Sequence, residues 1–313
     1  MKKIDFTALS TDGIHTLAGV VYLPEGEAKG IFHIVHGMTE HIVRYDTLMR
    51  DLAEAGYIAC GYDNLGHGRT ARDKSELGYI AKRNGWEYLV RDVAVFSSAV
   101  RECYGRSLPY YLMGHSMGSF IARLAAARQT DIQGLIVMGT GGPNPAAGAG
   151  LALIALNKRL FGDKHISPLI EKVAFGGYNK SFSDTEAPNP WLTTDLSVRE
   201  RYKDDPYCCF KFTVSAMGDL IRLTKNANAA SWYKSMPKNL PVLLVSGKND
   251  VVGDFGKGVL TVKKHLEKAG VTVACRLYEG ARHEILNDFT YESVKNDILA
   301  FLNTDPKGDT AHA

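Results

Sequence analysis

The stretch that decides the fold is Pro109-Tyr110-Tyr111-Leu112-Met113-Gly114-His115-Ser116-Met117-Gly118, together with the residues that follow it. Its first five residues form a short, apolar and aromatic-rich run that predicts a β-strand. From Ser119 to Arg128, apolar side chains recur at helical spacing, which predicts a helix with one buried face. Only Gly-His-Ser-Met-Gly separates the two elements, so the turn at Ser116 must be very sharp.

A sharp turn from strand to helix constrains the residues on both sides of Ser116. Gly114 and Gly118 fit such a turn, because a Cβ at either position would collide with neighbouring backbone. The helix starts at the serine, so its free N–H groups and positive dipole end face any negative charge that forms nearby. A strand, Gly-x-Ser-x-Gly and a helix in succession resemble the nucleophile elbow of α/β-hydrolases, which makes Ser116 a candidate nucleophile.

Strands and helices alternate on both sides of this turn. Strands are predicted at 4–10, 17–23, 30–35, 57–62, 109–113, 134–139, 240–245 and 272–278, and helices at 45–55, 86–104, 119–128, 258–269 and 291–302. The first two strands read as a hairpin, and the rest predicts an α/β-hydrolase fold: a mostly parallel twisted sheet of about eight strands with helices on both faces. In such sheets, ligands bind at the carboxyl ends of the strands.

The alternation stops between residues 143 and 234, where no strand is evident. Helical pieces are predicted there at 147–161, 167–175 and 208–223, separated by segments rich in Gly, Pro and Asn. We therefore expect a first core part at 1–142, a helical cap or lid at 143–234, a second core part at 235–303 and a loose tail at 304–313. The alternative is that the insertion is a small second domain with no role at the site.

A serine hydroxyl becomes nucleophilic only beside a base that is itself oriented by an acid. In α/β-hydrolases the acid and then the histidine follow the serine along the chain. Asp250 comes just after the strand at 240–245, and His283 comes just after the last strand, so both belong to the rim that carries Ser116. Asp254 is the nearest rival acid, but it lies farther from the end of the strand.

The other histidines fit the role of base less well, because they lie in helices, strands or chain ends, or precede the acid. Four of them, on rim loops before the nucleophile, are interpreted as hydrogen-bonding loop residues: His36, His41, His67 and His115. The backbone N–H groups of Met117 and Met38 are the candidate oxyanion donors, with Gly37 allowing close approach of the backbone. No HExxH or comparable ligand spacing occurs, so no metal site is expected.

Composition narrows the class of protein. The 313 residues are 45% hydrophobic and 23% charged, and the net charge of +3 is too small and dispersed to favour nucleic acid as a partner. Five cysteines without CxxC spacing suit a reducing compartment, and we expect a cytoplasmic protein. The charged N-terminus has no apolar run behind it, which argues against a signal peptide. No stretch approaches the roughly 18 apolar residues of a spanning helix.

Five segments together resemble the monoacylglycerol lipase and lysophospholipase branch of the α/β-hydrolases, among the hydrolases of serine aminopeptidase S33 type. These segments are His36-Gly37-Met38-Thr39-Glu40-His41, Asp63-Asn64-Leu65-Gly66-His67-Gly68, Gly114-His115-Ser116-Met117-Gly118, Gly247-Lys248-Asn249-Asp250 and Gly280-Ala281-Arg282-His283-Glu284. The insertion carries no such motif. Thr70 and Ser119 depart from the family, which usually has Ser at the first position and often Gly at the second.

The resemblance implies a hydrolase of carboxylic esters, such as monoacylglycerols or lysophospholipids, that needs no cofactor. Ser116 would attack the acyl carbonyl, His283 would take its proton, and Asp250 would hold His283 in the right tautomer. An apolar cap would form the acyl pocket and allow transient contact with lipid surfaces, without stable membrane insertion.

Two alternatives stay open. The same triad could cleave a peptide or a C–C bond, and a peptidase would need cap carboxylates, for which Glu171, Asp184 and Glu186 are available. The chain could also be a ligand-binding module without catalysis, because a fold does not determine a function.

Overall fold

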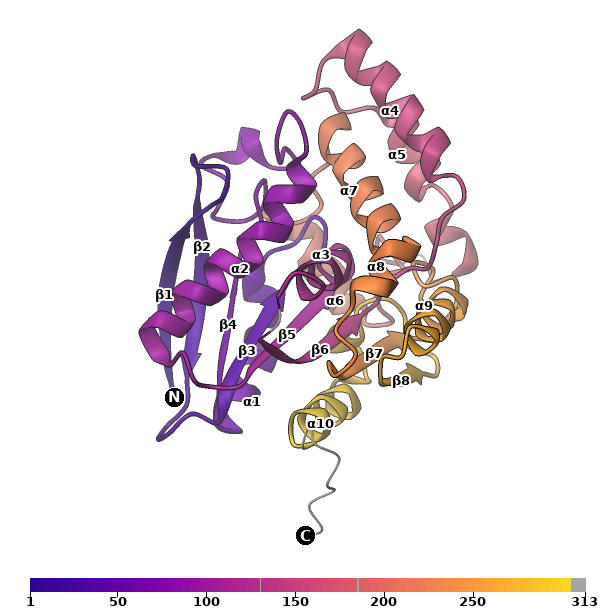
Figure 1. Cartoon of the computed structure of the whole chain (residues 1–313). Coiled ribbons are helices and arrows are strands. Elements are labelled where there is room, and N and C mark those ends of the chain that lie inside the picture. The colour runs from indigo at the N-terminus through magenta and orange to yellow at the C-terminus, as the bar shows by residue number, and fades with distance from the viewer. Residues whose placement is uncertain (130, 185, 305–313) are drawn as a thin grey trace.

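An eight-stranded sheet runs through the molecule (Figure 1). The computed structural model describes residues 1–129, 131–184 and 186–304, so the predicted tail lies outside the described residues beyond Thr304. The strand order is β1-β2-β4-β3-β5-β6-β7-β8, with β2 antiparallel to β1 and β4 and all other pairs parallel. The strands are β1 (Lys2–Leu9), β2 (Thr16–Leu23), β3 (Gly30–Val35), β4 (Tyr57–Tyr62), β5 (Tyr110–His115), β6 (Ile132–Met138), β7 (Val242–Gly247) and β8 (Val273–Tyr278). The predicted hairpin and mostly parallel sheet are confirmed.

Both faces of the sheet are covered by apolar side chains. Every residue of β3, β4, β5 and β7 is buried, which explains why these strands read as continuous apolar runs. Alternate residues of β3 enter different clusters: Ile31 and Val35 pack on one face, and Phe32 and Ile34 on the other. The central strands therefore form a rigid platform for the loops at their ends.

Ten α-helices and four short 3₁₀ helices occur among the described residues. The α-helices are α1 (Asp46–Glu54), α2 (Gly85–Tyr104), α3 (Met117–Ala126), α4 (Ala147–Phe161), α5 (Pro168–Phe175), α6 (Leu196–Asp204), α7 (Val214–Ala227), α8 (Ala230–Ser235), α9 (Lys257–Lys268) and α10 (Tyr291–Leu302). The 3₁₀ helices are η1 (Ile42–Tyr45), η2 (Lys74–Glu76), η3 (Tyr178–Ser181) and η4 (Ile285–Asn287).

Of the three helices predicted between residues 143 and 234, those at 147–161 and 167–175 are confirmed as α4 and α5, and the third is misplaced. The helix expected from residue 208 starts only at Val214, because the Thr213 side chain caps it by accepting the backbone N–H of Ala216. Helix α6 was not predicted. Its sequence is mostly polar, and its start is set by Asp195, whose carboxylate accepts two backbone N–H groups. Helix α8 was also missed, since its six residues are too few for a periodic signal.

The helices between β6 and β7 contact the rest of the molecule through helix α3. Figure 1 shows α4, α5 and α7 together at one end of the molecule, and α7 packs against both α3 and α4. The buried guanidinium of Arg123 donates to the Ala227 carbonyl and to Asn228 Oδ1, and it lies 4.4 Å from the Trp232 ring. No described helix is long and apolar enough to cross a membrane.

A second contact between α7 and the core predicts a pH-dependent stability. Asp219 of α7 is buried at the start of α2, where the backbone N–H groups of Gly85 and Trp86 face its carboxylate. Burial outweighs these groups and raises the pKa of Asp219 from 3.8 to about 6. Between pH 3.8 and about 6, Asp219 is ionised in the unfolded chain but still protonated in the folded protein. The free energy of unfolding therefore falls as pH rises through this range, and the full loss of stability is reached above pH 6.

Asp219→Asn is therefore expected to stabilise the protein above pH 6, by up to about 3 kcal/mol at pH 8. Asparagine keeps an acceptor for the α2 N–H groups but carries no charge to desolvate. The gain should vanish near pH 4 in urea unfolding curves measured across this range. A variant that is less stable than the wild type at pH 8 would contradict the assignment.

Candidate active site

The turn at Ser116 is strained in the way the sequence predicts. Strand β5 ends at His115 and helix α3 begins at Met117, so Ser116 alone makes the turn, with φ 52° and ψ −121°. A Cβ at Gly114 would lie 2.1 Å from the Gly118 carbonyl oxygen, and a Cβ at Gly118 would lie 2.1 Å from the Val35 carbonyl oxygen. Both glycines are therefore required by the close approach of backbone.

Asp250 and His283 are brought together at the ends of β7 and β8. His283 Nδ1 lies 2.9 Å from Asp250 Oδ2, and both side chains are buried. The carboxylate also accepts the Val252 N–H at 2.8 Å and the Ser246 hydroxyl at 3.2 Å. Burial disfavours the charge of Asp250, but the charge of His283 and its hydrogen bond outweigh burial and lower the pKa of the carboxyl. Asp254, the rival acid, is exposed.

The histidine ring lies against the elbow. The rings of His115 and His283 have centroids 4.9 Å apart, and Ser116 directly follows His115. Nε2 of His283 is buried and has no hydrogen-bond partner among the described residues, Ser116 Oγ included. Hydrogen bonds of catalytic groups are often long in free enzymes and tighten when substrate binds.

Gly139 gives the histidine ring its space and was not singled out from the sequence. A Cβ at Gly139 would lie 3.1 Å from His283 Cε1 and 3.3 Å from His115 Nε2. Its φ of 58° also favours glycine. Its place directly after a buried strand was the feature of the sequence that could have marked Gly139 as a site residue.

The loop after β3 touches the elbow and presents the free N–H group of Met38. A Cβ at Gly37 would lie 3.1 Å from Ser116 Cβ, and the Gly37 N–H donates to Glu40 Oε1 at 2.5 Å. Within the described chain, the N–H groups of Met38 and Met117 form no hydrogen bond. These two donors, one from the loop and one from the first turn of α3, are free for an oxyanion.

A buried ionic network links the loop after β3 to the loop of His283. Arg44 donates to Glu40 at 2.9 Å and, through both its terminal nitrogens, to Glu284 at 2.6 and 2.7 Å. The Tyr45 hydroxyl lies 2.8 Å from both Glu40 Oε1 and His115 Nδ1. In the sequence, Glu40 and Glu284 stand out only as parts of the motifs at 36–41 and 280–284. Charged side chains next to both candidate catalytic loops were the signal that could have revealed their pairing.

The charge of this network reaches the elbow through His115. Burial disfavours a protonated ring, but the hydrogen bond to Glu40 and the charge of Glu40 outweigh burial and raise the pKa of His115. The network therefore holds the residue before the candidate nucleophile in one orientation.

The insertion contributes an aromatic side chain to the site. Trp191 lies with its ring centroid 5.1 Å from that of His283, and the Tyr178 ring contacts Trp191 edge-on at the same centroid distance. Neither residue was predicted, because nothing in the sequence of the insertion marks which of its aromatic residues turns toward the sheet.

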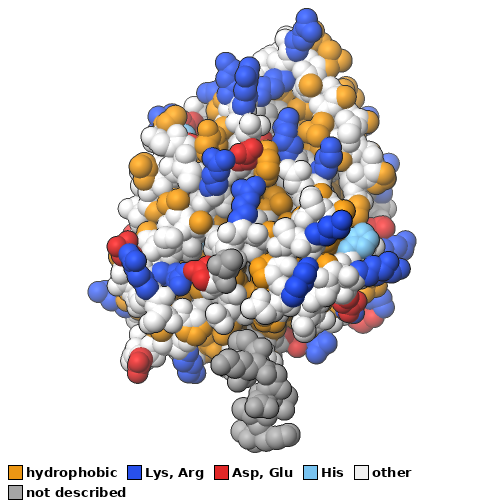
Figure 2. Space-filling view, viewed as in Figure 1, with side chains coloured by type: hydrophobic (Ala, Val, Ile, Leu, Met, Phe, Trp, Pro, Cys, Tyr) orange, Lys and Arg blue, Asp and Glu red, His pale blue; other side chains and the backbone are white. Residues whose placement is uncertain are grey.

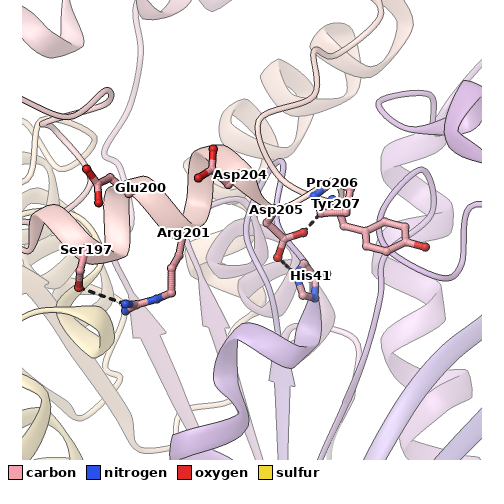
Figure 3. A pocket seen from close by; sticks show the side chains of 8 residues that line it. All are labelled: His41, Ser197, Glu200, Arg201, Asp204, Asp205, Pro206 and Tyr207. Carbon is pink, nitrogen blue, oxygen red and sulfur yellow. Dashed lines mark hydrogen bonds and ion pairs between the residues drawn. The ribbon is translucent and has the colours of Figure 1, made fainter.

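The remaining rim histidines are hydrogen-bonded, as expected. His36 accepts the Asn64 N–H at 2.8 Å, and His67 Nδ1 contacts the Leu65 carbonyl at 2.9 Å. Burial lowers the pKa of His67 to about 3, so its ring is neutral at physiological pH. His41 lies 2.9 Å from Asp205 of the insertion (Figure 3).

One group of side chains has the spacing of a metal site. His41, Asp205 and Cys208 each offer a ligand atom, and the three atoms lie within 4.8 Å of one another. Burial raises the pKa of the Cys208 thiol, and a protonated thiol is a poor ligand. Because His41 and Asp205 already bind each other, we interpret the group as a contact between insertion and core.

The two departures from the family pattern have structural roles. The Thr70 hydroxyl donates to the Asp63 carbonyl at 2.6 Å and accepts the Ala18 N–H at 2.9 Å. The Ser119 hydroxyl donates to the Ser116 carbonyl at 2.6 Å. Both hydroxyls therefore support the backbone of the rim loops.

Comparison with known proteins shows to which lipases and esterases the chain is similar. The chain is 26% identical over 287 residues to monoglyceride lipase of Rattus norvegicus, covering 90% of this chain and 83% of that protein. It is 25% identical over 308 residues to monoacylglycerol lipase of Mycolicibacterium smegmatis, covering 94% and 98% of the two chains. Among solved structures, a thermostable carboxyl esterase from Bacillus coagulans in complex with glycerol superposes with a TM-score of 0.91 and 28% identity, covering 97% and 98% of the two chains.

The family described as "Serine aminopeptidase, S33" matches residues 26–290. That range includes the elbow, the loop after β3, Asp250, His283 and the whole insertion. The family resemblance and the α/β-hydrolase fold predicted from the motifs are confirmed. The chain belongs to the serine aminopeptidase S33 family of α/β-hydrolases, in the branch that resembles monoglyceride lipases.

Proposed function

We propose that the protein is a serine hydrolase of carboxylic esters, with monoacylglycerols, lysophospholipids or similar acyl esters as substrates. The observation that carries the proposal is the buried Asp250–His283 pair beside the strained Ser116 turn. The lipases and the esterase to which the chain is similar support it, and the glycerol bound to the Bacillus coagulans esterase suits the alcohol part of a monoacylglycerol.

The proposed reaction has two steps. Ser116 Oγ attacks the acyl carbonyl while His283 Nε2 takes the hydroxyl proton, and Asp250 stabilises the imidazolium through Nδ1. The N–H groups of Met38 and Met117 stabilise the oxyanion, and the proton then passes from His283 to the departing alcohol. Water hydrolyses the acyl-enzyme by the same route and releases the acid. No cofactor takes part in these steps.

The peptidase alternative is less well supported by the insertion. Two of the three acidic candidates are occupied in ion pairs, Asp184 with Arg282 and Glu171 with Lys211. Glu186 is exposed. An aminopeptidase binds the ammonium group of its substrate through a free carboxylate in the site. Because none of these three carboxylates meets that need, we favour esters as substrates. A ligand-binding module would have no need for a histidine oriented by a buried carboxylate.

Fluorophosphonate labelling tests the proposed function. The probe should react with the wild-type protein at Ser116, located by peptide mass spectrometry, and nitrophenyl esters of increasing chain length should show a preferred acyl length. Proline aminoacyl amides turned over faster than esters would favour the peptidase alternative. Absence of both labelling and ester hydrolysis would contradict the proposal.

We also propose that residues 143–234 form a cap over the site and that α4 and α5 contact lipid surfaces. The exposed apolar side chains of α4, α5 and the loop between them are Leu156, Leu160, Phe161, Ile166, Leu169 and Val173. Basic residues lie among them, and Figure 2 shows Lys or Arg and hydrophobic side chains next to each other at the upper end of the molecule. This combination suits an anionic lipid surface. The five free cysteines fit the cytoplasmic location that we propose.

Leu160→Glu combined with Phe161→Glu should weaken binding to vesicles of phosphatidylcholine and phosphatidylglycerol at least about tenfold, because two apolar side chains leave the membrane. Co-sedimentation measures the binding. Hydrolysis of a short soluble ester should not change. Leu260→Glu, at an exposed position of α9, is the matched control. Equal vesicle binding by all three proteins would contradict a surface role for α4.

A further inference from the structure

A segment of the insertion, here called the brace, comprises residues 182–184 and 186–207 and contacts both loops that carry proposed catalytic groups. Toward the histidine loop, Arg282 donates to both carboxylate oxygens of Asp184 at 2.8 Å and to the Pro190 carbonyl at 2.5 Å. The Glu284 N–H, one residue beyond His283, donates to the Leu192 carbonyl at 2.7 Å. Arg282 and Glu284 thus attach the brace on both sides of the candidate base.

The brace also reaches the loop that carries Met38. The Tyr202 hydroxyl lies 3.0 Å from the Thr39 carbonyl oxygen and 2.8 Å from the Thr39 hydroxyl. Arg44 lies 4.8 Å from the centre of the Tyr202 ring. Asp205 binds His41 at the other end of the same loop (Figure 3). The proposed oxyanion loop and histidine loop are therefore connected through one segment.

Asp184 forms ion pairs with the core and with helix α6 of the brace. Its carboxylate pairs with Arg282 on the core and, at 3.2 Å, with Arg199 of α6, whose side chain is completely buried. Arg199 also donates to the Asp184 backbone carbonyl at 3.0 Å. The hydrogen bond from Arg282 and the nearby guanidinium charges lower the pKa of Asp184. The fork geometry of the Arg282–Asp184 pair, with two parallel bonds, fixes direction as well as distance.

We propose that Arg282 is a positioning residue: through Asp184 it holds the brace so that Trp191 covers His283 and keeps the base dry and correctly oriented. The proposal rests on the proposed function, which makes His283 the base. His283 is only 2% exposed, and Trp191 is the brace residue whose ring contacts its imidazole. Water entering beside His283 would weaken its interaction with Asp250 and give the ring other orientations.

Arg282→Met tests the proposal against Arg201→Met as a matched control. Arg201 lies on the same brace but is exposed, and its side chain donates only to Ser197 within the described chain. Arg282→Met should slow fluorophosphonate labelling and short-ester turnover about a hundredfold, as expected for a displaced catalytic group. Arg282→Lys keeps the charge but not the two parallel hydrogen bonds, so its labelling and turnover rates should lie between those of Arg282→Met and the wild type. The rates of Arg201→Met should stay within about twofold of the wild type.

The fluorescence of Trp191 reports the brace directly. The emission of Trp191 is the difference between the wild type and Trp191→Phe. Because the indole packs on the buried ring of His283, this emission should be partly protected from quenching by acrylamide. The protection should shrink in Arg282→Met and persist in Arg201→Met.

Asp184→Asn weakens the same ion pair from the brace side with little change of shape. It should reduce both the labelling rate and the protection of Trp191, and it replaces Arg282→Met as the test if that variant does not fold. Unlabelled wild-type protein would contradict the proposed function while leaving the fluorescence test intact. Unchanged protection of Trp191 from acrylamide and an unchanged labelling rate in folded Arg282→Met or Asp184→Asn would overturn the positioning role.

Discussion

Ser116→Ala is expected to lower kcat for nitrophenyl esters by at least about 10⁴-fold and to abolish fluorophosphonate labelling. The neighbouring Ser119 hydroxyl already donates to the Ser116 carbonyl, so it is not a ready substitute for the Ser116 hydroxyl. The substitution removes a single oxygen atom, and the side chain at 116 is not needed for the turn itself. Initial rates at saturating ester, with the thermal unfolding curve of the same sample, measure the effect.

Ser116→Gly is the matched control for structure. At φ 52° a residue with a Cβ is strained, so glycine should leave the protein equally inactive and about 1 kcal/mol more stable than the wild type. Such a gain would show strain held at the position of the proposed nucleophile. Ester hydrolysis that survives in both variants would mean that another residue is the nucleophile.

Asp250→Asn is expected to lower kcat about 10⁴-fold while leaving KM for a short ester nearly unchanged. An asparagine can turn its amide N–H toward Nδ1 of His283, which places the imidazole proton on Nε2. A protonated Nε2 cannot accept the hydroxyl proton of Ser116. Asp254→Asn changes an exposed carboxylate in the same loop and should have no effect on kcat. The opposite ranking of the two variants would assign the acid to Asp254.

The pH dependence of stability gives a second readout for Asp250. Its pKa is lower in the folded protein than the ordinary 3.8, so its ionised form stabilises the folded state above that pH. The contribution is lost as pH falls through the folded pKa. Below about pH 4, thermal stability of the wild type should therefore fall more steeply than that of Asp250→Asn.

The strands along the chain and the elbow could be predicted from the sequence because their signals are local. Gly114 and Gly118 are required by backbone contacts within or beside the turn, and buried parallel strands leave continuous apolar runs. Asp250 and His283 were found by their positions after predicted strands. Parallel strands end at one edge of a sheet, so position in the sequence already indicated a shared location.

The insertion was predicted less well for the opposite reason. Its helices are set by single capping residues such as Asp195 and Thr213, and α6 has little apolar periodicity. The division into core and cap at 143 and 234 stays a proposal.

The sequence by itself determined the sheet, the turn at Ser116 and the family, because neighbouring residues and strand order carry that information. Only the tertiary structure decided that Trp191 packs on His283 and that Arg282 pairs with Asp184. The same holds for the pairing of Glu40 and Glu284 with the guanidinium of Arg44. Apart from the Glu40–Arg44 pair, these contacts join side chains far apart along the chain. Each depends on how irregular loops pack against one another, and no local pattern of residues encodes that packing.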